Sequence, residues 1–172
     1  MEIKEFDERF AAITHERDLE LLRRTFELAN EGRASGNNPF GALLADAEGN
    51  ILIEQSNNEV TTHDCTAHAE TSVARRASMT YDKQFLWNCT LYTSAEPCCM
   101  CTGAIYWANI GRIVFAMSEN MLFNTTGDNE ANPSFNHSCR EILSKGQKEI
   151  VVNGPFLEIL DEALAPHKGF WD

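Results

Sequence analysis

The chain has 172 residues, 26 of them acidic and 14 basic, which gives a formal net charge of −12. A chain of this length can bury a full hydrophobic core, so residues 1–172 are expected to fold as a single domain. The excess of acidic over basic residues argues against a protein that binds nucleic acid, because such a protein needs a basic surface to displace counterions from phosphates. Six cysteines, no apolar run long enough for a bilayer and no secretory leader predict a reducing, cytoplasmic location.

Two helices and a hairpin are predicted in the first part of the chain. Apolar spacing predicts a longer amphipathic helix over about 17–34, after a short helical extension within residues 1–15. Residues 40–45 and 51–55 flank a turn-forming sequence and predict two antiparallel strands. The short N-terminal helix is predicted from the spacing of Ile3, Phe6, Phe10 and Ile13.

Helices and strands alternate in the middle of the chain. We predict helices over about 66–79 and 97–108, with Pro97 at the first position of the second, and strands over 90–94 and 112–116. Strands alternating with helices predict an α/β fold with an α/β/α layered sheet.

The last part of the chain is predicted to be a loop followed by a helix. Residues 118–136 are polar and predict a long ordered loop, a kind of segment that is usually functional. Pro155 is expected to open a helix that carries Leu157, Leu160 and Leu164.

Two short motifs carry the chemistry of the chain. His68-Ala69-Glu70 stands at the start of one predicted helix, and Pro97-Cys98-Cys99-Met100-Cys101 at the start of another. Together they form the H-x-E…P-C-x-x-C pattern, in which one imidazole and two thiolates bind zinc. A catalytic zinc keeps its fourth position for water, so Glu70 is expected to move protons. The dipole at a helix start favours the thiolates of Cys98 and Cys101.

Other cysteines leave alternatives open. A closed four-ligand site could recruit Cys65 or Cys99, and Cys99 also offers a second pair with Cys101. Residues two apart point to different faces of a helix, so we assign Cys98 and Cys101 as the ligands together with His68.

Four runs of the sequence go beyond the metal pattern: 38–42 (Asn-Pro-Phe-Gly-Ala), 64–70 (Asp-Cys-Thr-Ala-His-Ala-Glu), 91–101 (Leu-Tyr-Thr-Ser-Ala-Glu-Pro-Cys-Cys-Met-Cys) and 103–108 (Gly-Ala-Ile-Tyr-Trp-Ala). Together they resemble the cytidine-deaminase-like superfamily, and within it the branch of guanine deaminases and tRNA adenosine deaminases, closest to bacterial guanine deaminase. The resemblance covers roughly residues 17–171. It implies a mixed five-stranded sheet between helices, one zinc ion per chain and a homodimer.

The resemblance also implies roles for residues around the zinc. Asn58 would hydrogen-bond the substrate ring, and the backbone of Ala69 would touch it. Phe40 and Trp107 match aromatic residues of the pocket, although either could simply be core, and Asn58 could equally be a turn residue. Cys65 and Cys99 stand where the family has prolines, which alters the rigidity of the first helical turns.

The end of the chain departs from the family. Guanine deaminases carry a Phe-Asp-Asp run that helps read the purine, and here Asp128 or Glu130 would serve instead. The resemblance implies that residues 155–172 are exchanged between copies. We therefore expect the aromatic pair Phe170 and Trp171 to pack over an active site, that of a neighbouring copy.

These observations predict hydrolytic deamination of a small amino-heterocycle. Zinc would lower the pKa of its bound water to about 7, and Glu70 would pass protons to the ring and to the leaving amine. Our best prediction is guanine, converted to xanthine and ammonia. The alternatives are a tRNA-specific adenosine deaminase, an aminohydrolase of guanosine, a cytosine-type base or a triazine, and an inactive metal-binding scaffold.

Overall fold

The computed structural model describes residues 7–127 and 129–172, which build a mixed β-sheet of five strands. The strand order is β2-β1-β3-β4-β5. Strand β1 runs antiparallel to both of its neighbours, whereas β3, β4 and β5 are parallel to one another. The strands are β1 (Gly41–Ala45), β2 (Ile51–Ser56), β3 (Thr90–Ala95), β4 (Arg112–Met117) and β5 (Val151–Asn153).

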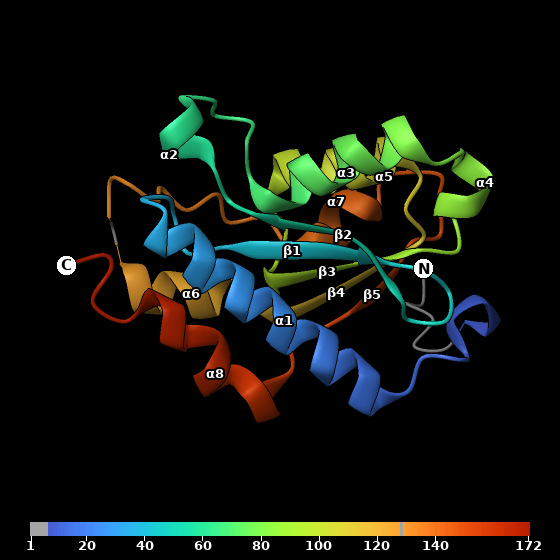
Figure 1. The fold of residues 1–172 in the computed structure, drawn as a ribbon, viewed down its shortest axis with the longest axis horizontal. Coiled ribbons are helices and arrows are strands. Elements are labelled where there is room, and N and C mark those ends of the chain that lie inside the picture. Colours follow the sequence, from blue (N-terminus) through green and yellow to red (C-terminus); the bar gives the residue numbers. More distant parts are fainter. Residues whose placement is uncertain (1–6, 128) are drawn as a thin grey trace.

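Helices cover both faces of the sheet (Figure 1). On one face lie α1 (His15–Ala34) and α8 (Leu160–Leu164). On the other lie α3 (Ala69–Thr80), α5 (Cys99–Ala108) and α7 (Cys139–Leu143). This arrangement confirms the predicted three-layer α/β/α fold. Three short helices stand in the connections: α2 (Glu59–Thr62), α4 (Lys83–Leu86) and α6 (Glu119–Thr126).

The two central parallel strands are buried along their whole length. Successive side chains of a strand point to opposite faces, so these strands contribute to both cores. Leu91 and Ile113 pack toward α3 and α5, whereas Tyr92 and Val114 pack toward α1 and α8. The carboxyl ends of β3 and β4 therefore lie between two layers of helices, which is where α/β proteins commonly bind ligands.

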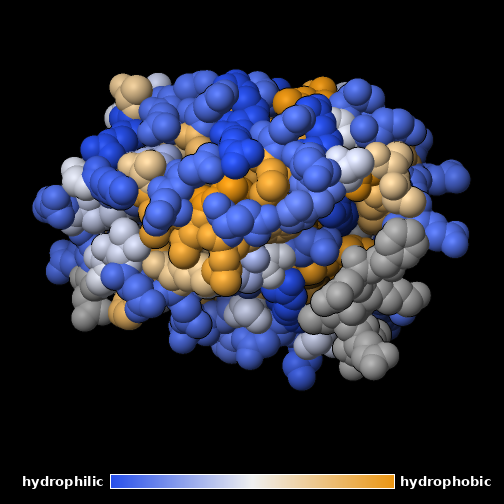
Figure 2. All heavy atoms as spheres, turned by 90° about the horizontal axis from the view of Figure 1, so that it is seen from below, coloured by the Kyte–Doolittle hydropathy of each residue, from blue (hydrophilic) through white to orange (hydrophobic). Residues whose placement is uncertain are grey.

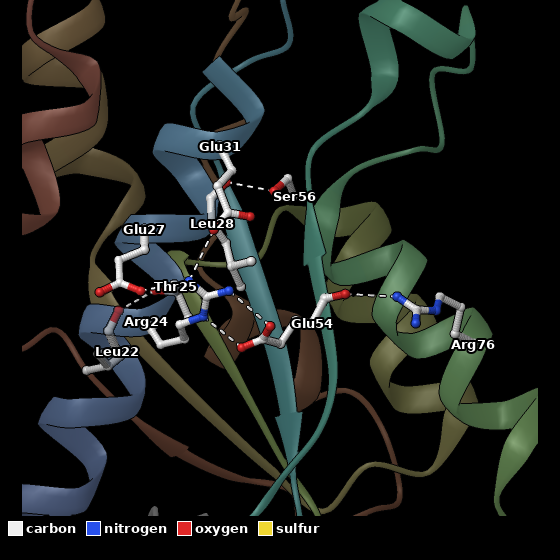
Figure 3. Close-up of polar contacts among 9 residues, drawn as sticks. All are labelled: Leu22, Arg24, Thr25, Glu27, Leu28, Glu31, Glu54, Ser56 and Arg76. Carbon is white, nitrogen blue, oxygen red and sulfur yellow. Dashed lines mark hydrogen bonds and ion pairs between the residues drawn. The ribbon is translucent and has the colours of Figure 1, made fainter. Parts of the chain in front are cut away.

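The edge strand β2 is held from both helical layers (Figure 3). The Glu54 carboxylate accepts hydrogen bonds from Arg24 Nε at 2.7 Å and Arg24 Nη2 at 3.0 Å. From the opposite face, Arg76 Nη1 donates to the Glu54 carbonyl at 2.8 Å. The bonds to Arg24 lower the pKa of the Glu54 carboxyl group, so this pair stays charged. Covering an edge strand with such side chains also discourages pairing with other chains.

Figure 2 views the molecule from the side of α1 and α8. Polar side chains dominate this face and surround a central apolar patch. Among the described residues, no helix combines the length and the hydropathy needed to cross a membrane.

The predicted long loop over 118–136 is partly wrong, because it contains helix α6. Ser118 caps this helix by accepting a hydrogen bond from Met121 N at 3.3 Å. Leu122 packs on the inner face against Ala95 and Met117. A helix this short has few apolar positions, so its spacing is a weak signal in the sequence.

Both helices that carry the motifs begin later than predicted. Helix α3 begins at Ala69, with His68 as its N-cap, because Thr66 is held in a turn by the Asp64 carboxylate. Helix α5 begins at Cys99, with Cys98 rather than Pro97 at its boundary. The ligating residues therefore lie at the N-terminal ends of the two helices.

The chain ends also differ in detail from the predictions. In the described part of the N-terminal extension, Glu8–Phe10 forms a 3₁₀ helix with Phe10 buried, while Ile3 and Phe6 lie outside the described residues. The predicted C-terminal helix begins at Leu157 rather than at Pro155. It consists of a 3₁₀ turn, α8 and a further 3₁₀ turn over Ala165–His167.

Candidate metal centre and cavity

The predicted ligands meet at the N-terminal ends of two neighbouring helices. His68 is the N-cap of α3, Cys98 is the N-cap of α5, and Cys101 follows in the first turn of α5. Their ligand atoms lie within 4.8 Å of one another. Cys98 Sγ and Cys101 Sγ lie 3.7 and 3.6 Å from His68 Nδ1.

These distances fit a tetrahedral zinc ion. Typical zinc–sulfur and zinc–nitrogen bond lengths place a thiolate and an imidazole nitrogen about 3.5 Å apart on such an ion. A hydrogen bond from Cys101 and the proximity of His68 lower the pKa of the Cys98 thiol, which favours the thiolate that zinc requires. In the described part of the chain the group comprises His68, Cys98 and Cys101 only, so Cys65 and Cys99 lie outside it.

Two further side chains support the ligands, and neither was predicted from the sequence. Glu59 Oε2 lies 3.5 Å from His68 Nε2, where it can fix the orientation of the imidazole ring. Thr71 Oγ1 donates to Cys101 Sγ at 3.2 Å. Glu59 is the first residue of α2 and belongs to neither ligand motif, so the spacing of the motifs could not indicate it.

Glu70 lies beside the ligands and within the same cavity. It stands in the first turn of α3 and is only 5% exposed. Its Oε1 accepts a hydrogen bond from Thr93 Oγ1 at 2.9 Å, and its Oε2 lies 3.6 Å from Cys101 Sγ. Burial raises the pKa of the Glu70 carboxyl group, which suits a residue that takes up and returns a proton.

We expect the purified protein to carry about one zinc ion per chain, and His68→Ala or Cys98→Ser to lose most of it. Each change removes one of three protein ligands, which leaves too few to hold the ion. Metal analysis by mass spectrometry after extensive dialysis measures the content. The matched control is Cys99→Ser, which changes the adjacent cysteine outside the ligand group. Full zinc retention in both ligand variants would contradict the assignment.

A cavity of about 490 Å³ opens at the ligand cluster, within the size range of small-molecule sites. None of the described residues that line it is lysine or arginine, and four of them are glutamates. Its lining comprises Asn38, Phe40, Asn57, Glu59, Cys65, His68, Glu70, Ala95, Glu96, Cys98, Cys99, Met100, Glu119, Leu122, Ala131, Asn132, Pro133 and Phe135.

Two of the predicted substrate residues are absent from the cavity lining. Asn57, and not Asn58, lines the cavity, while the Asn58 Oδ1 atom is buried without a hydrogen-bond partner among the described residues. Trp107 is 73% exposed on α5 and lies outside the cavity lining, so it is not core, and its contact with a substrate stays a prediction. Phe40 lines the cavity as predicted. Ala69 is buried at the start of α3, and its backbone contact with a substrate stays a prediction.

Of the two acids predicted in the loop, only Glu130 belongs to the described residues. Glu130 is exposed and is absent from the cavity lining, and Asp128 lies outside the described residues. Glu119, at the start of α6, lines the cavity instead. Burial raises the pKa of the Glu119 carboxyl group, while Ser134 Oγ donates to its Oε1 at 2.6 Å.

The aromatic tail packs behind the cavity of its own chain. Phe170 and Trp171 are absent from the cavity lining of their own chain, and their place over the active site of a neighbouring copy stays a prediction. The Trp171 ring lies 6.3 Å from that of Phe40, and its Nε1 donates to His167 Nδ1 at 3.1 Å. The Trp171 carbonyl accepts a hydrogen bond from Asn129 Nδ2 at 2.6 Å. Trp171 therefore supports one wall of the cavity from outside.

Known proteins with related sequences include several deaminases. The chain is 41% identical to a probable cytosine deaminase of Schizosaccharomyces pombe over 158 residues, 91% of this chain and 94% of that protein. It is 37% identical to the guanine deaminase of Bacillus subtilis, with 87% and 90% of the two chains covered. A tRNA-specific adenosine deaminase of Haemophilus influenzae is 39% identical over 63% of each chain.

Solved structures give the same picture. The guanine deaminase of Nitrosomonas europaea superposes with a TM-score of 0.67 at 26% identity, over 85% of this chain and 80% of that one. The model of the cytidine and deoxycytidylate deaminase zinc-binding region matches residues 15–117, which include all three ligands and Glu70. The chain is therefore a member of the cytidine and deoxycytidylate deaminase family, with the zinc-binding region of that family built from His68, Cys98 and Cys101.

Proposed function

We propose that the chain is a zinc-dependent hydrolytic deaminase of an uncharged free base or nucleoside. The observation that carries this proposal is the position of Glu70, a buried carboxylate beside three zinc ligands in a cavity without a lysine or arginine among its described lining residues. An inactive scaffold would have no need to keep a charged group in such a place, because burying it costs free energy.

The chain's own residues supply the proton transfers of the reaction. When bound, zinc supplies a polarised water whose pKa is lowered to about 7. Glu70 would take the two protons of a water molecule in turn and deliver one to the ring nitrogen and one to the leaving amine, so that water is consumed and ammonia released. Thr93 Oγ1 donates to Glu70 Oε1 and holds the carboxylate in one orientation. Phe40 offers an aromatic surface for a flat ring.

The charges of the cavity favour an uncharged substrate. Four glutamates line it, and no lysine or arginine stands among its described residues to hold a phosphate. A deoxycytidylate-type substrate would therefore meet repulsion. The Asn57 side chain is suited to hydrogen-bond the edge of a substrate ring. Its Oδ1 accepts a hydrogen bond from Glu59 N at 3.1 Å, and its amide nitrogen makes no hydrogen bond within the described residues.

Guanine, converted to xanthine and ammonia, is the best single candidate. The relatives that cover most of the chain support a free base as substrate, since they are a guanine deaminase and a probable cytosine deaminase. Two structural neighbours, which cover 85% and 76% of this chain, are guanine deaminases and favour guanine. Cytosine is the first alternative, on the 41% identity to the probable cytosine deaminase.

A tRNA substrate is a weaker candidate. The related tRNA enzyme covers only 63% of this chain, and the net charge of −12 opposes contact with a polyanion. We further propose a cytoplasmic homodimer that folds as a single domain. Trp107 on α5 and Met79 on α3 support a dimer, since they are 73% and 82% exposed and would gain from being covered.

A substrate panel tests the proposal. We expect ammonia release to be fastest with an uncharged base, guanine first, and to be slower by about tenfold or more with deoxycytidylate, because a phosphate enters an acidic cavity. The panel comprises guanine, guanosine, cytosine, isocytosine, an amino-triazine, deoxycytidylate and a tRNA. Submicromolar binding of tRNA at physiological salt, with inosine formed in it, would contradict the small-molecule assignment. No ammonia from any member by a zinc-loaded protein would contradict the enzyme.

A further inference from the structure

Glu96 joins two helices that are distant in the sequence. It follows β3, directly before Pro97, and is only 7% exposed. Its Oε2 accepts a hydrogen bond from Glu119 N at 3.2 Å, and its Oε1 accepts one from Cys139 N at 2.9 Å. These amides open α6 and α7. The first amides of a helix have no partner inside the helix, so one buried carboxylate satisfies both.

The chain between these two amides forms one side of the cavity. We call the described residues of this stretch, 119–127 and 129–139, the wall segment. It contributes a glutamate, a leucine from α6 and part of the irregular chain that follows, so roughly a third of the described lining comes from it. Its lining residues are Glu119, Leu122, Ala131, Asn132, Pro133 and Phe135.

The middle of the wall segment is held mainly by side chains. Between Gly127 and Ser138 the described residues form no helix or strand. Ser134 Oγ donates to Glu119 Oε1 at 2.6 Å, and Asn129 Nδ2 donates to the Trp171 carbonyl at 2.6 Å. Segments with so few backbone hydrogen bonds open readily, so the fixed ends decide where the middle lies.

Glu96 is arranged to hold both ends of the wall segment. Both of its oxygens are engaged by backbone N–H groups, and it makes no ion pair with a lysine or arginine among the described residues. Burying a carboxylate is costly unless its oxygens accept strong hydrogen bonds, and these two amides supply them. It also precedes the ligand Cys98 by two residues, which links the wall segment to the metal-binding helix.

We propose that Glu96 is a positioning residue that fixes both ends of the wall segment and thereby shapes the cavity for its substrate. It acts through the segment and not on the reacting atoms. The kinetic part of this inference rests on the proposed deaminase function, whereas the structural part does not.

Hydrogen exchange measured by mass spectrometry tests the structural part on the zinc-loaded protein. Glu96→Gln keeps the shape but turns an amide NH₂ toward one of the two backbone N–H groups. We expect exchange in α6 and α7 to become faster by about tenfold or more, the size expected from losing a hydrogen bond to a charged group. Glu96→Asp keeps the charge but is too short to reach both amides, so it should open one end. Unchanged exchange in both variants would overturn the inference.

The matched control is Glu141→Gln. Glu141 also caps the start of α7, accepting from Ser138 N at 3.2 Å, but it is exposed and does not contact α6. We expect it to leave exchange in α6 and the kinetics unchanged. Zinc content is measured in every variant. If both Glu96 variants lost zinc while hydrogen exchange in the wall segment stayed as slow as in the wild type, Glu96 would belong to the metal site and the inference would be overturned.

Steady-state kinetics on the best substrate of the panel tests the link to substrate binding. We expect Glu96→Gln to raise KM by about tenfold and to change kcat by less than about threefold, because binding and not chemistry depends on the wall. Faster exchange with an unchanged KM would overturn this link. A wild-type protein without deaminase activity would contradict the proposed function, while the exchange experiment would still decide whether Glu96 holds the wall segment.

Discussion

Glu70→Gln is expected to lower the rate of ammonia release by about two to four orders of magnitude while zinc content and folding stay nearly unchanged. Glutamine has the size of glutamate and can keep the hydrogen bond from Thr93, but it cannot accept a proton at neutral pH. Glu70 also lies outside the ligand group, so the metal should remain. Ammonia release, metal analysis and a melting curve of the same preparation measure the three properties.

The control for this change is Glu20→Gln, which neutralises an exposed glutamate of α1 paired with Arg17. It should leave activity and zinc as in the wild type. Loss of zinc from Glu70→Gln would show that Glu70 is structural. Full activity would require another proton carrier, and Glu119 would be the next candidate because it lines the same cavity.

The metal centre could be predicted from the sequence because its parts are local. His68 and Glu70 stand two residues apart at one helix start, and Cys98 and Cys101 three apart at another. Helical geometry alone then decides which side chains share a face. Only the meeting of the two helix starts depends on the fold, and the resemblance to a known family supplied that step.

The substrate side of the cavity could not be predicted as well. Asn57 and Asn58 are neighbours of the same type in a connection between β2 and α2, where no periodicity tells which one points inward. Trp107 has the apolar character of a core residue, yet α5 presents it to the surface. A motif indicates which residue types belong to a site, but which residue of a loop points into the cavity depends on the fold.

Glu96 and Glu119, whose hydrogen-bond partners are distant in the sequence, could not be predicted for a different reason. Glu96 bonds to amides 23 and 43 residues away, and Glu119 meets Ser134 across an irregular segment. Such contacts depend on where β4 and α7 return to the cavity. The short β5 and α7 have too few residues to show a period, so their places were not predicted.

Asp18→Asn is expected to lower the free energy of unfolding by about 3–5 kcal/mol. Asp18 on α1 and Arg112 on β4 form a buried ion pair, with Arg112 Nη2 donating to Asp18 Oδ2 at 2.6 Å and both side chains 8% exposed. Asp18 Oδ1 also accepts from the Tyr92 hydroxyl at 2.6 Å. Asparagine removes the negative charge and leaves Arg112 buried without a counterion. Urea unfolding of the zinc-loaded protein measures the change.

The matched control is Glu162→Gln, which breaks the pair between Glu162 on α8 and Arg23 on α1. These side chains are 48% and 47% exposed, so water screens them and the change should cost less than about 1 kcal/mol. Asp18 lies outside the cavity lining, and kcat of the folded Asp18→Asn protein should match the wild type. Because Tyr92 precedes Thr93, which holds Glu70, a fall in kcat would instead connect the buried pair to the site. Equal losses of stability in the two variants would show that burial adds nothing to the pair, and that apolar packing alone holds α1 against the sheet.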